Sequence, residues 1–130
     1  MNTMKNNAIG WVEVPVDDMD RAIKFYEKVF DFKIERHQMG PLDMGWFPFI
    51  EDGLGSGGSL VHAEGYYNPS EDGVLIYFTA HSGDLDTDLS RVEVAGGEIQ
   101  QPKTKISDEH GFMAVFLDSE GNRIALHSRQ

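Results

Sequence analysis

Cysteine is missing from all 130 residues of the sequence. Its absence excludes disulfides, zinc sites with thiolate ligands, iron–sulfur clusters and a cysteine nucleophile. It also fits a reducing compartment, so we expect a cytoplasmic location. Long apolar runs are missing as well: stretches such as Val115-Phe116-Leu117 are far shorter than the roughly 20 apolar residues that cross a bilayer. We therefore expect no membrane-spanning segment.

Basic residues are scarce: 11 Lys and Arg stand against 22 Asp and Glu, for a net charge of −11. Nucleic acid and anionic membranes are therefore not expected as partners, because neutralising phosphates requires clustered Lys and Arg. Two interpretations of the acidic balance stay open. It is either the solvated surface of a soluble protein or a negative field that attracts a cationic ligand.

The length and composition indicate one folded domain. A chain of 130 residues with 40% apolar and 25% charged residues can bury one substantial core. The first seven residues, Met1 to Asn7, are polar and lack the apolar segment of a secretory signal. We expect them to form a short disordered start.

The sequence contains an internal repeat. An apolar strand, Val12–Val16, leads to Asp17-Asp18-Met19-Asp20, and a second strand, Ile76–Ala80, leads to Asp84-Leu85-Asp86. Each acidic group can cap a helix, because a carboxylate at this position accepts hydrogen bonds from free backbone N–H groups. Helical spacing follows in both copies. The apolar positions are Met19, Ala22, Ile23, Tyr26, Val29 and Phe30, then Leu85, Leu89, Val92 and Ala95, with Gly96-Gly97 ending the second helix.

Three further strands complete each half. They are Phe32–His37, Trp46–Ile50 and Ser59–His62 in the first, and Glu98–Gln101, Phe112–Leu117 and Ile124–His127 in the second. The sequence therefore predicts an α+β fold of two tandem βαβββ modules, module 1 at about residues 8–64 and module 2 at about 74–128, joined by a linker at 65–73. Each sheet has one face left open by its helix, so we expect the halves to pack side by side around a central cleft.

Two kinds of loop are expected at this cleft. The glycine-rich segment Gly53–Gly58 lies in a hairpin turn and is predicted to be a flexible loop over the cleft. The polar segments His37–Gly45 and Lys103–Gly111 connect strands at corresponding positions of the two halves. They are predicted to be loops near the cleft entrance, which makes His110 a secondary candidate for the site.

Two segments resemble the vicinal oxygen chelate superfamily, which includes glyoxalases, bleomycin resistance proteins and extradiol dioxygenases. They are Val14–Tyr26, with its V-x-D-[MLI]-x-R-[AS]-[IL]-x-F-Y character, and the turn in Phe116–Ile124. The resemblance covers roughly residues 8–128. Metal-dependent relatives take four ligands from the first and last strands of each half. Those positions fall here on Trp11, Leu60, Leu75 and Ala125, whose side chains do not coordinate divalent ions, so no metal cofactor is expected at this site.

Strand side chains alternate between faces, so the residue two positions along from each ligand position shares its face. These residues are Glu13, His62, Tyr77 and His127, and the pocket walls are predicted to include Trp11, Phe47 and Phe49. Three interpretations stay open: a polar rim, a set of groups that orients a polar ligand, or a displaced metal site of Glu13, His62 and His127. A metal-free enzyme would use Glu13 as general base and a histidine as acid.

The leading functional hypothesis is a protein that holds a small organic molecule in an aromatic cleft, either as a binding module or as a metal-independent enzyme of unknown reaction. One alternative is a metal-dependent lyase or isomerase of the glyoxalase type that uses the displaced site. Another is a drug-sequestering protein of the bleomycin-resistance type. The resemblance also implies a homodimer.

Overall fold

The computed structural model describes residues 4–130. Its elements, in chain order, are β1 (Trp11–Pro15), α1 (Met19–Phe30), β2 (Glu35–Met39), β3 (Leu42–Trp46), β4 (Gly57–His62), β5 (Ile76–Thr79), α2 (Leu85–Leu89), α3 (Val92–Ala95), β6 (Glu98–Ser107), β7 (Gly111–Leu117) and β8 (Arg123–Ser128). Of the predicted disordered start, residues 1–3 lie outside the described part, and residues 4–7 are exposed without helix or strand.

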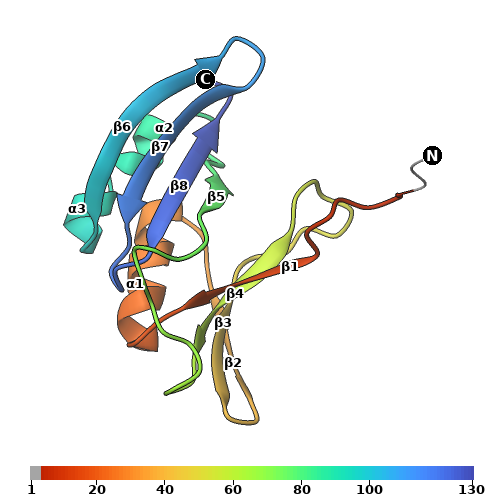
Figure 1. Ribbon diagram of the computed structural model, residues 1–130, viewed down its shortest axis with the longest axis vertical. Helices are drawn as coiled ribbons and strands as arrows, with labels where there is room; N and C mark the ends of the chain where they lie inside the picture. Colours follow the sequence, from red (N-terminus) through yellow and green to blue (C-terminus); the bar gives the residue numbers. More distant parts are fainter. Residues whose placement is uncertain (1–3) are drawn as a thin grey trace.

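The strands form two four-stranded sheets of the same design (Figure 1). The first, sheet A, has the order β1-β4-β3-β2, and the second, sheet B, has the order β5-β8-β7-β6. Strand β1 pairs in parallel with β4, and β5 pairs in parallel with β8. The remaining pairs are antiparallel. The predicted α+β fold of two tandem βαβββ modules is therefore confirmed.

Helix α1 begins and ends where the sequence indicates. The side chain of Asp18 caps it by accepting a hydrogen bond of 3.1 Å from the Arg21 backbone N–H. At the other end Asp31 adopts the left-handed conformation, with φ of 55°, and donates its N–H to the Glu27 carbonyl. Six apolar or aromatic residues of the helix are buried: Met19, Ala22, Phe25, Tyr26, Val29 and Phe30.

The single helix predicted for the second module is wrong, because it is divided into α2 and α3. Asp84 caps α2 and Gly96, with φ of 109°, ends α3 as expected. Between them the Arg91 N–H bonds to the Asp88 carbonyl, a tighter i→i−3 turn, and the Ser90 hydroxyl bonds to the Thr87 carbonyl. These local bonds compete with the regular helical pattern and interrupt the helix.

The predicted strand Trp46–Ile50 is also wrong, because the sheet ends at Trp46. The Phe47 N–H still bonds to the Gly58 carbonyl at 3.0 Å, but Pro48 has no N–H with which to continue the ladder. The chain therefore leaves sheet A. Phe47 and Phe49 become free to contribute to a cavity between the modules.

The polar connections predicted as loops are mostly strand. In module 2, β6 continues to Ser107 and pairs with β7, so that the turn consists of residues 108–110. In module 1, Met39 pairs with Leu42, which leaves the turn at Gly40-Pro41. Both connections are tight hairpins, because their residues find backbone partners on the adjacent strand.

One hydrophobic core joins the two modules. It includes side chains from α1, α2 and α3 together with the helix-facing sides of both sheets, such as Leu60 of sheet A and Phe116 of sheet B. Three rings of α1 cross the boundary directly: Phe25 contacts Phe116, and Tyr26 and Phe30 contact Phe78. Since the helix-facing sides of the sheets share this core, the opposite faces of the sheets lie on the outside of the molecule.

A polar network ties α1 to the β7–β8 turn of the other module. The Tyr26 hydroxyl donates to Asp118 at 2.6 Å, and Asp118 also accepts the N–H groups of Glu120 and Asn122. Burial raises the pKa of Asp118 above its ordinary value, although these hydrogen bonds oppose the shift. Burial also raises the pKa of Tyr26, so its hydroxyl stays a donor.

Candidate functional site

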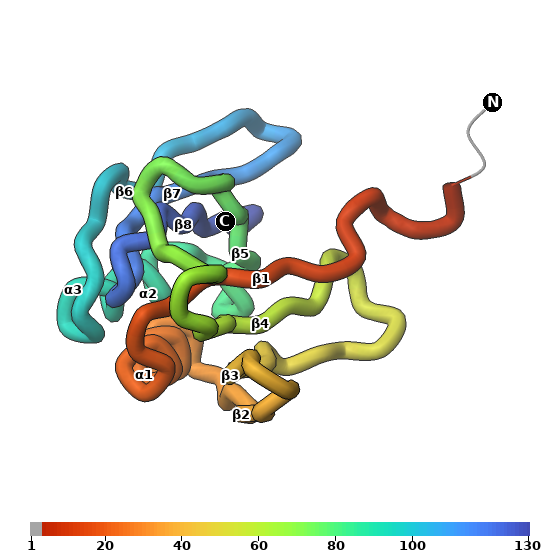
Figure 2. Tube along the Cα trace, turned by 60° about the horizontal axis from the view of Figure 1, so that its bottom comes forward, coloured from red at the N-terminus to blue at the C-terminus, as the bar shows by residue number. Residues whose placement is uncertain are grey.

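A cavity of about 660 Å³ opens between the modules. It begins where the shared core ends, between Val12 of β1, the end of α1 and strand β5. In both Figure 1 and Figure 2, the run of chain before β1 lies beside the loop that joins β3 to β4, and both segments contribute to the cavity. The lining residues come from four segments: 9–12, 30–32, 47–58 and 74–81.

Aromatic rings form the inner wall of the cavity. The ring of Phe47 stands edge-on to Phe78, with centroids 5.4 Å apart, and lies 6.0 Å from the ring of Phe32. Phe30 stacks on Phe78 at 5.0 Å. Because these rings hold one another from both modules, the inner wall is preformed and suited to an aromatic or hydrophobic molecule.

The rim of the cavity exposes large apolar side chains. Phe49 and Ile50 are about 70% exposed (69% and 71%), and Leu54 is fully exposed. Val74 and Tyr77, on the opposite side, are also exposed. A contiguous apolar rim of this kind marks a surface that a ligand or partner covers.

Few polar side chains reach the cavity. Asp31 lies at the end of α1, Thr79 and His81 lie at the end of β5, and Ser56 lies in the glycine-rich loop. The sequence-based reasoning missed Asp31 and His81. The only signal for Asp31 was its place after the last apolar residue of the helix, which does not show what the helix end faces.

Half of the predicted cleft residues line this cavity, and the other half do not. Phe47, Phe49, Leu75 and Tyr77 contribute to it. The remaining four, Trp11, Leu60, Ala125 and His110, are not among its lining residues. The prediction of one ring formed by Trp11, Leu60, Leu75 and Ala125 is therefore wrong, because the sheets meet through their helix-facing sides.

Glu13 and Trp11 lie on the outer face of sheet A. Glu13 is the Cα partner of Ser59, whereas Leu60 is the partner of Val14, which belongs to the core. Partners in a sheet point to the same side, so Leu60 and His62 point away from Glu13. The prediction that Glu13 and His62 share a face is wrong by one residue of register. His62 instead contacts the Val16 carbonyl through Nδ1 at 2.9 Å.

The outer face of sheet A carries an aromatic group of its own. The rings of Trp11 and Trp46 meet edge to face at 5.9 Å. Beside them the Tyr67 hydroxyl donates to Glu13 at 2.6 Å, and this hydrogen bond raises the pKa of Tyr67. Within residues 4–130 the buried atoms Trp46 Nε1 and Ser59 Oγ find no hydrogen-bond partner. Such atoms are rare in folded proteins.

The histidines of sheet B lie at the far end of its hairpin. His127 contacts the His110 carbonyl through Nε2 at 2.5 Å, and His110 Nδ1 lies 2.9 Å from the Ser107 hydroxyl. Tyr77 and His127 belong to the same outer face, since Tyr77 pairs with Ala125, and Ala125 and His127 are two residues apart on β8. The structure therefore does not bring Glu13, His62 and His127 together.

A metal ion is the cofactor that the resemblance calls for in its metal-dependent members. The register places Ser59 or Val61, and not Leu60, on the outer face at the end of module 1. The indole, hydroxyl, isobutyl and methyl groups of Trp11, Ser59, Leu75 and Ala125 do not provide the imidazole and carboxylate donors of such sites. Among residues 4–130 no three His, Asp or Glu side chains come together so that they could hold a metal ion.

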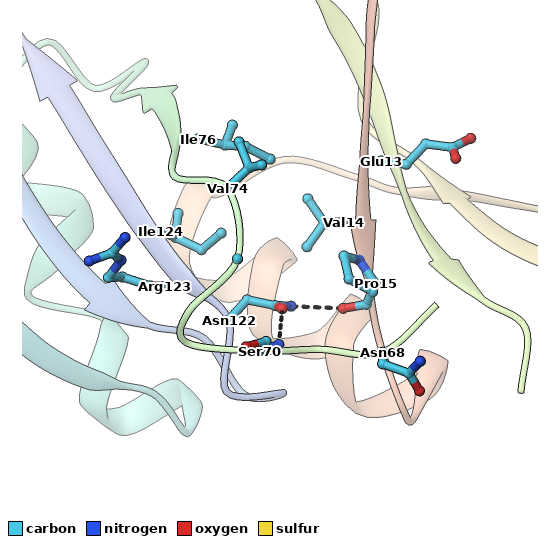
Figure 3. Close-up of a pocket in the computed structure, with 11 residues that line it drawn as sticks. Glu13, Val14, Pro15, Asn68, Ser70, Val74, Ile76, Asn122, Arg123 and Ile124 are labelled. Carbon is cyan, nitrogen blue, oxygen red and sulfur yellow. Dashed lines mark hydrogen bonds between the residues drawn. The ribbon is translucent and has the colours of Figure 1, made fainter. Parts of the chain in front are cut away.

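A smaller cavity of about 220 Å³ lies between β1 and the start of β8 (Figure 3). Asn122 organises it, because its amide donates to the Pro15 carbonyl at 2.7 Å and accepts from the Ser70 N–H at 3.1 Å. Figure 3 shows Val14 and Ile124 on its inner side and the Glu13 side chain pointing away. This cavity joins the linker to both modules, and its fixed contacts indicate a structural role.

The longest helix has 12 residues, and none within residues 4–130 has the length and apolar character needed to cross a bilayer.

The comparison with curated proteins gives no match. Solved structures, in contrast, match over nearly the whole chain. A domain described as glyoxylase/bleomycin resistance protein/dioxygenase from a Frankia species matches with a TM-score of 0.70 and 17% identity, over 95% of this chain and 98% of that one.

Two further structures extend the range of relatives. Glyoxalase I from Zea mays matches with a TM-score of 0.65 and 20% identity over 92% of this chain, which spans 45% of that enzyme's length. TnmS3, an antibiotic-binding protein from a Streptomyces species, matches with a TM-score of 0.63 and 22% identity over 98% of this chain and 99% of its own. At these identities the similarity shows the fold alone.

A family model gives the remaining evidence. The model described as the Glyoxalase/Bleomycin resistance protein/Dioxygenase superfamily matches residues 8–126, which include every strand and helix except the last two residues of β8. The match agrees with the paired sheets and with the repeated order of their strands. The chain therefore belongs to the Glyoxalase/Bleomycin resistance protein/Dioxygenase superfamily.

Proposed function

We propose that this protein binds a small, largely aromatic organic molecule in the cavity between its modules, without a metal ion. The observation that carries the proposal is the cavity of about 660 Å³ with aromatic walls and an exposed apolar rim. Its volume falls within the ~300–1,000 Å³ of typical small-molecule sites. The inner rings are held by contacts between the modules, so little reorganisation is needed for a ligand to enter.

Binding is favoured over catalysis by the place of the titratable groups. Glu13, His62 and His127, which a metal-free enzyme would use as base and acid, are not among the residues that line the cavity. The antibiotic-binding relative also covers the same length of chain. Sequestration of an antibiotic is therefore the form of binding that we favour.

We further propose that the protein is a homodimer in the cytoplasm. The outer face of sheet A exposes 44% of Trp11, next to buried polar atoms that lack a partner within the described chain. A second copy placed on this face would bury the indole ring. The cytoplasmic location rests on the absence of cysteine.

The experiment uses three tricyclic probes of similar shape but different charge: acridine, the N-methylacridinium cation and anthracenecarboxylate. Binding is measured by fluorescence titration and by the rise in melting temperature, since a ligand that binds only the folded state stabilises it. Tyr77→Ala removes a ring of the rim, and Tyr66→Ala removes an exposed ring that is not among the lining residues.

We expect at least one probe to bind the wild-type protein. Tyr77→Ala should weaken this binding by about 3- to 10-fold, the contribution of one aromatic contact, and Tyr66→Ala should leave it unchanged. Failure of all three probes to bind, or equal losses in the two variants, would contradict the proposed function.

A further inference from the structure

We propose that the ligand of the cavity is an organic cation and that the carboxylate of Asp31 is its counter-ion. This inference rests on the proposed function and adds the charge class of the ligand. It follows from the charges around the cavity, from the position of Asp31 and from the chemistry of the walls.

The charges at the cavity are of one sign. Of the lining residues within the described part of the chain, Asp31 carries the one carboxylate, and none is Lys or Arg. The four segments that border the cavity, 9–12, 30–32, 47–58 and 74–81, contain no Lys or Arg. The net charge of −11 extends this field over the whole molecule and favours the approach of cations.

Asp31 is free to pair with a ligand. Its backbone is fixed by the hydrogen bond from its N–H to the Glu27 carbonyl at 3.0 Å, and its side chain is exposed. None of the ion pairs formed within residues 4–130 involves Asp31. The nearby Arg91 is engaged elsewhere: its Nε donates to the Val29 carbonyl and its Nη2 lies 3.8 Å from Asp88.

The aromatic walls of the cavity also favour a positively charged ligand. The faces of aromatic rings carry negative potential and attract cations, most strongly where water is excluded. Six rings line the cavity: Phe30, Phe32, Phe47, Phe49, Tyr77 and Phe78. An anion would face these rings and a carboxylate without a Lys or Arg among the lining residues to pair with.

The test compares the three tricyclic probes at mildly alkaline pH, where acridine is neutral. We expect N-methylacridinium to bind more tightly than acridine by about 10-fold, and anthracenecarboxylate to bind least. Added salt should weaken the binding of the cation and leave that of acridine nearly unchanged.

A matched pair of variants assigns the effect to one carboxylate. Asp31→Asn and Asp52→Asn remove the same charge from backbones of similar conformation, with φ of 55° and 63°, but only Asp31 lines the cavity. Asp31→Asn should weaken N-methylacridinium binding by about 5- to 10-fold and acridine binding by less than about twofold. Asp52→Asn should change both by less than about twofold.

The outcomes separate the two proposals. Equal affinities for N-methylacridinium and acridine in the wild-type protein, or equal effects of the two variants, overturn the cation inference while the proposed binding function stands. If no probe binds, the proposed function fails together with the inference. The salt dependence is measured on the wild-type protein, so it decides the question even where Asp31→Asn is less stable.

Discussion

Glu120 shows how a single side chain connects the modules. Its carboxylate accepts the backbone N–H groups of Asp17 and Asp18, both at 2.9 Å, and pairs with Arg21 at 2.7 Å. It lies in the β7–β8 turn, whereas these partners lie at the start of α1. Burial raises the pKa of Glu120, but the Arg21 pair and the backbone bonds outweigh it, so the pKa lies below the ordinary 4.5.

We predict that Glu120→Gln lowers the free energy of unfolding by about 2 kcal/mol at neutral pH, the contribution of hydrogen bonds to a charged group. Because the pKa is lowered in the folded state, the carboxylate stabilises the fold above pH 4.5, and this stability is lost as the pH falls through the folded pKa. Urea unfolding at several pH values tests the prediction. The difference between variant and wild type should shrink in acid, and the exposed Glu71→Gln should have no effect at any pH.

At single positions, the sequence predicted which apolar residues line the cavity better than it predicted which polar residue lies beside them. Leu75 was expected at a cleft from the repeat and the resemblance, Tyr77 from strand alternation, and Phe47 and Phe49 as aromatic walls; all four line the cavity. Asp31 was not expected, because its role depends on what lies opposite the end of α1. That information comes from packing between the modules and is not local.

At the level of elements, register decided which predictions were correct. Trp11 and Glu13 share a face as expected, because both lie on β1. The step from β1 to β4 was wrong by one residue, and in a strand one residue exchanges the two faces. The pairing of Glu13 with Ser59 and of Val14 with Leu60 shows this. The segment Gly53–Gly58 has two glycines before β4 and no alternating pattern that could have fixed the register.

Gly58 is a point where β1 and β4 approach too closely for a side chain. A Cβ atom there would lie 2.6 Å from the Val12 carbonyl oxygen. We predict that Gly58→Ala destabilises the protein by about 1–3 kcal/mol, because the backbone of the β1–β4 pair must shift. Thermal unfolding measures the change. Gly10→Ala is the control, since a Cβ at Gly10 meets nothing within 4 Å; equal melting temperatures for the two variants would contradict the prediction.

At the level of the whole molecule, the outer faces of the sheets bear on assembly. We predict that the protein sediments as a dimer and that Trp11→Ala weakens the dimer by about 2 kcal/mol, as expected for a buried interface tryptophan. Val94→Ala, at an exposed position of α3, is the control and should not change the dimer. A wild-type protein that sediments as a monomer at high concentration would show that Trp11 faces solvent.

The repeat predicted two halves correctly, but not the way in which they meet. Each half has a sheet with a helix on one side, and two such halves can join through their open faces or through their helices. The apolar pattern of α1 is compatible with both. The rings of Phe25, Tyr26 and Phe30 decide for the helices, since all three contact module 2. As a result, the cavity lies between the modules at the edge of their shared core, and not at the predicted ring of Trp11, Leu60, Leu75 and Ala125.

The shared core also predicts what happens when the chain is divided between the two modules. Since α1 contributes buried rings to both halves, neither half can bury its own helix-facing side alone, yet the segment between β4 and β5 is largely exposed. Two separately produced polypeptides divided within that segment should therefore be unstructured apart and fold upon mixing. The present single chain would then resemble a pair of subunits that became permanently tethered.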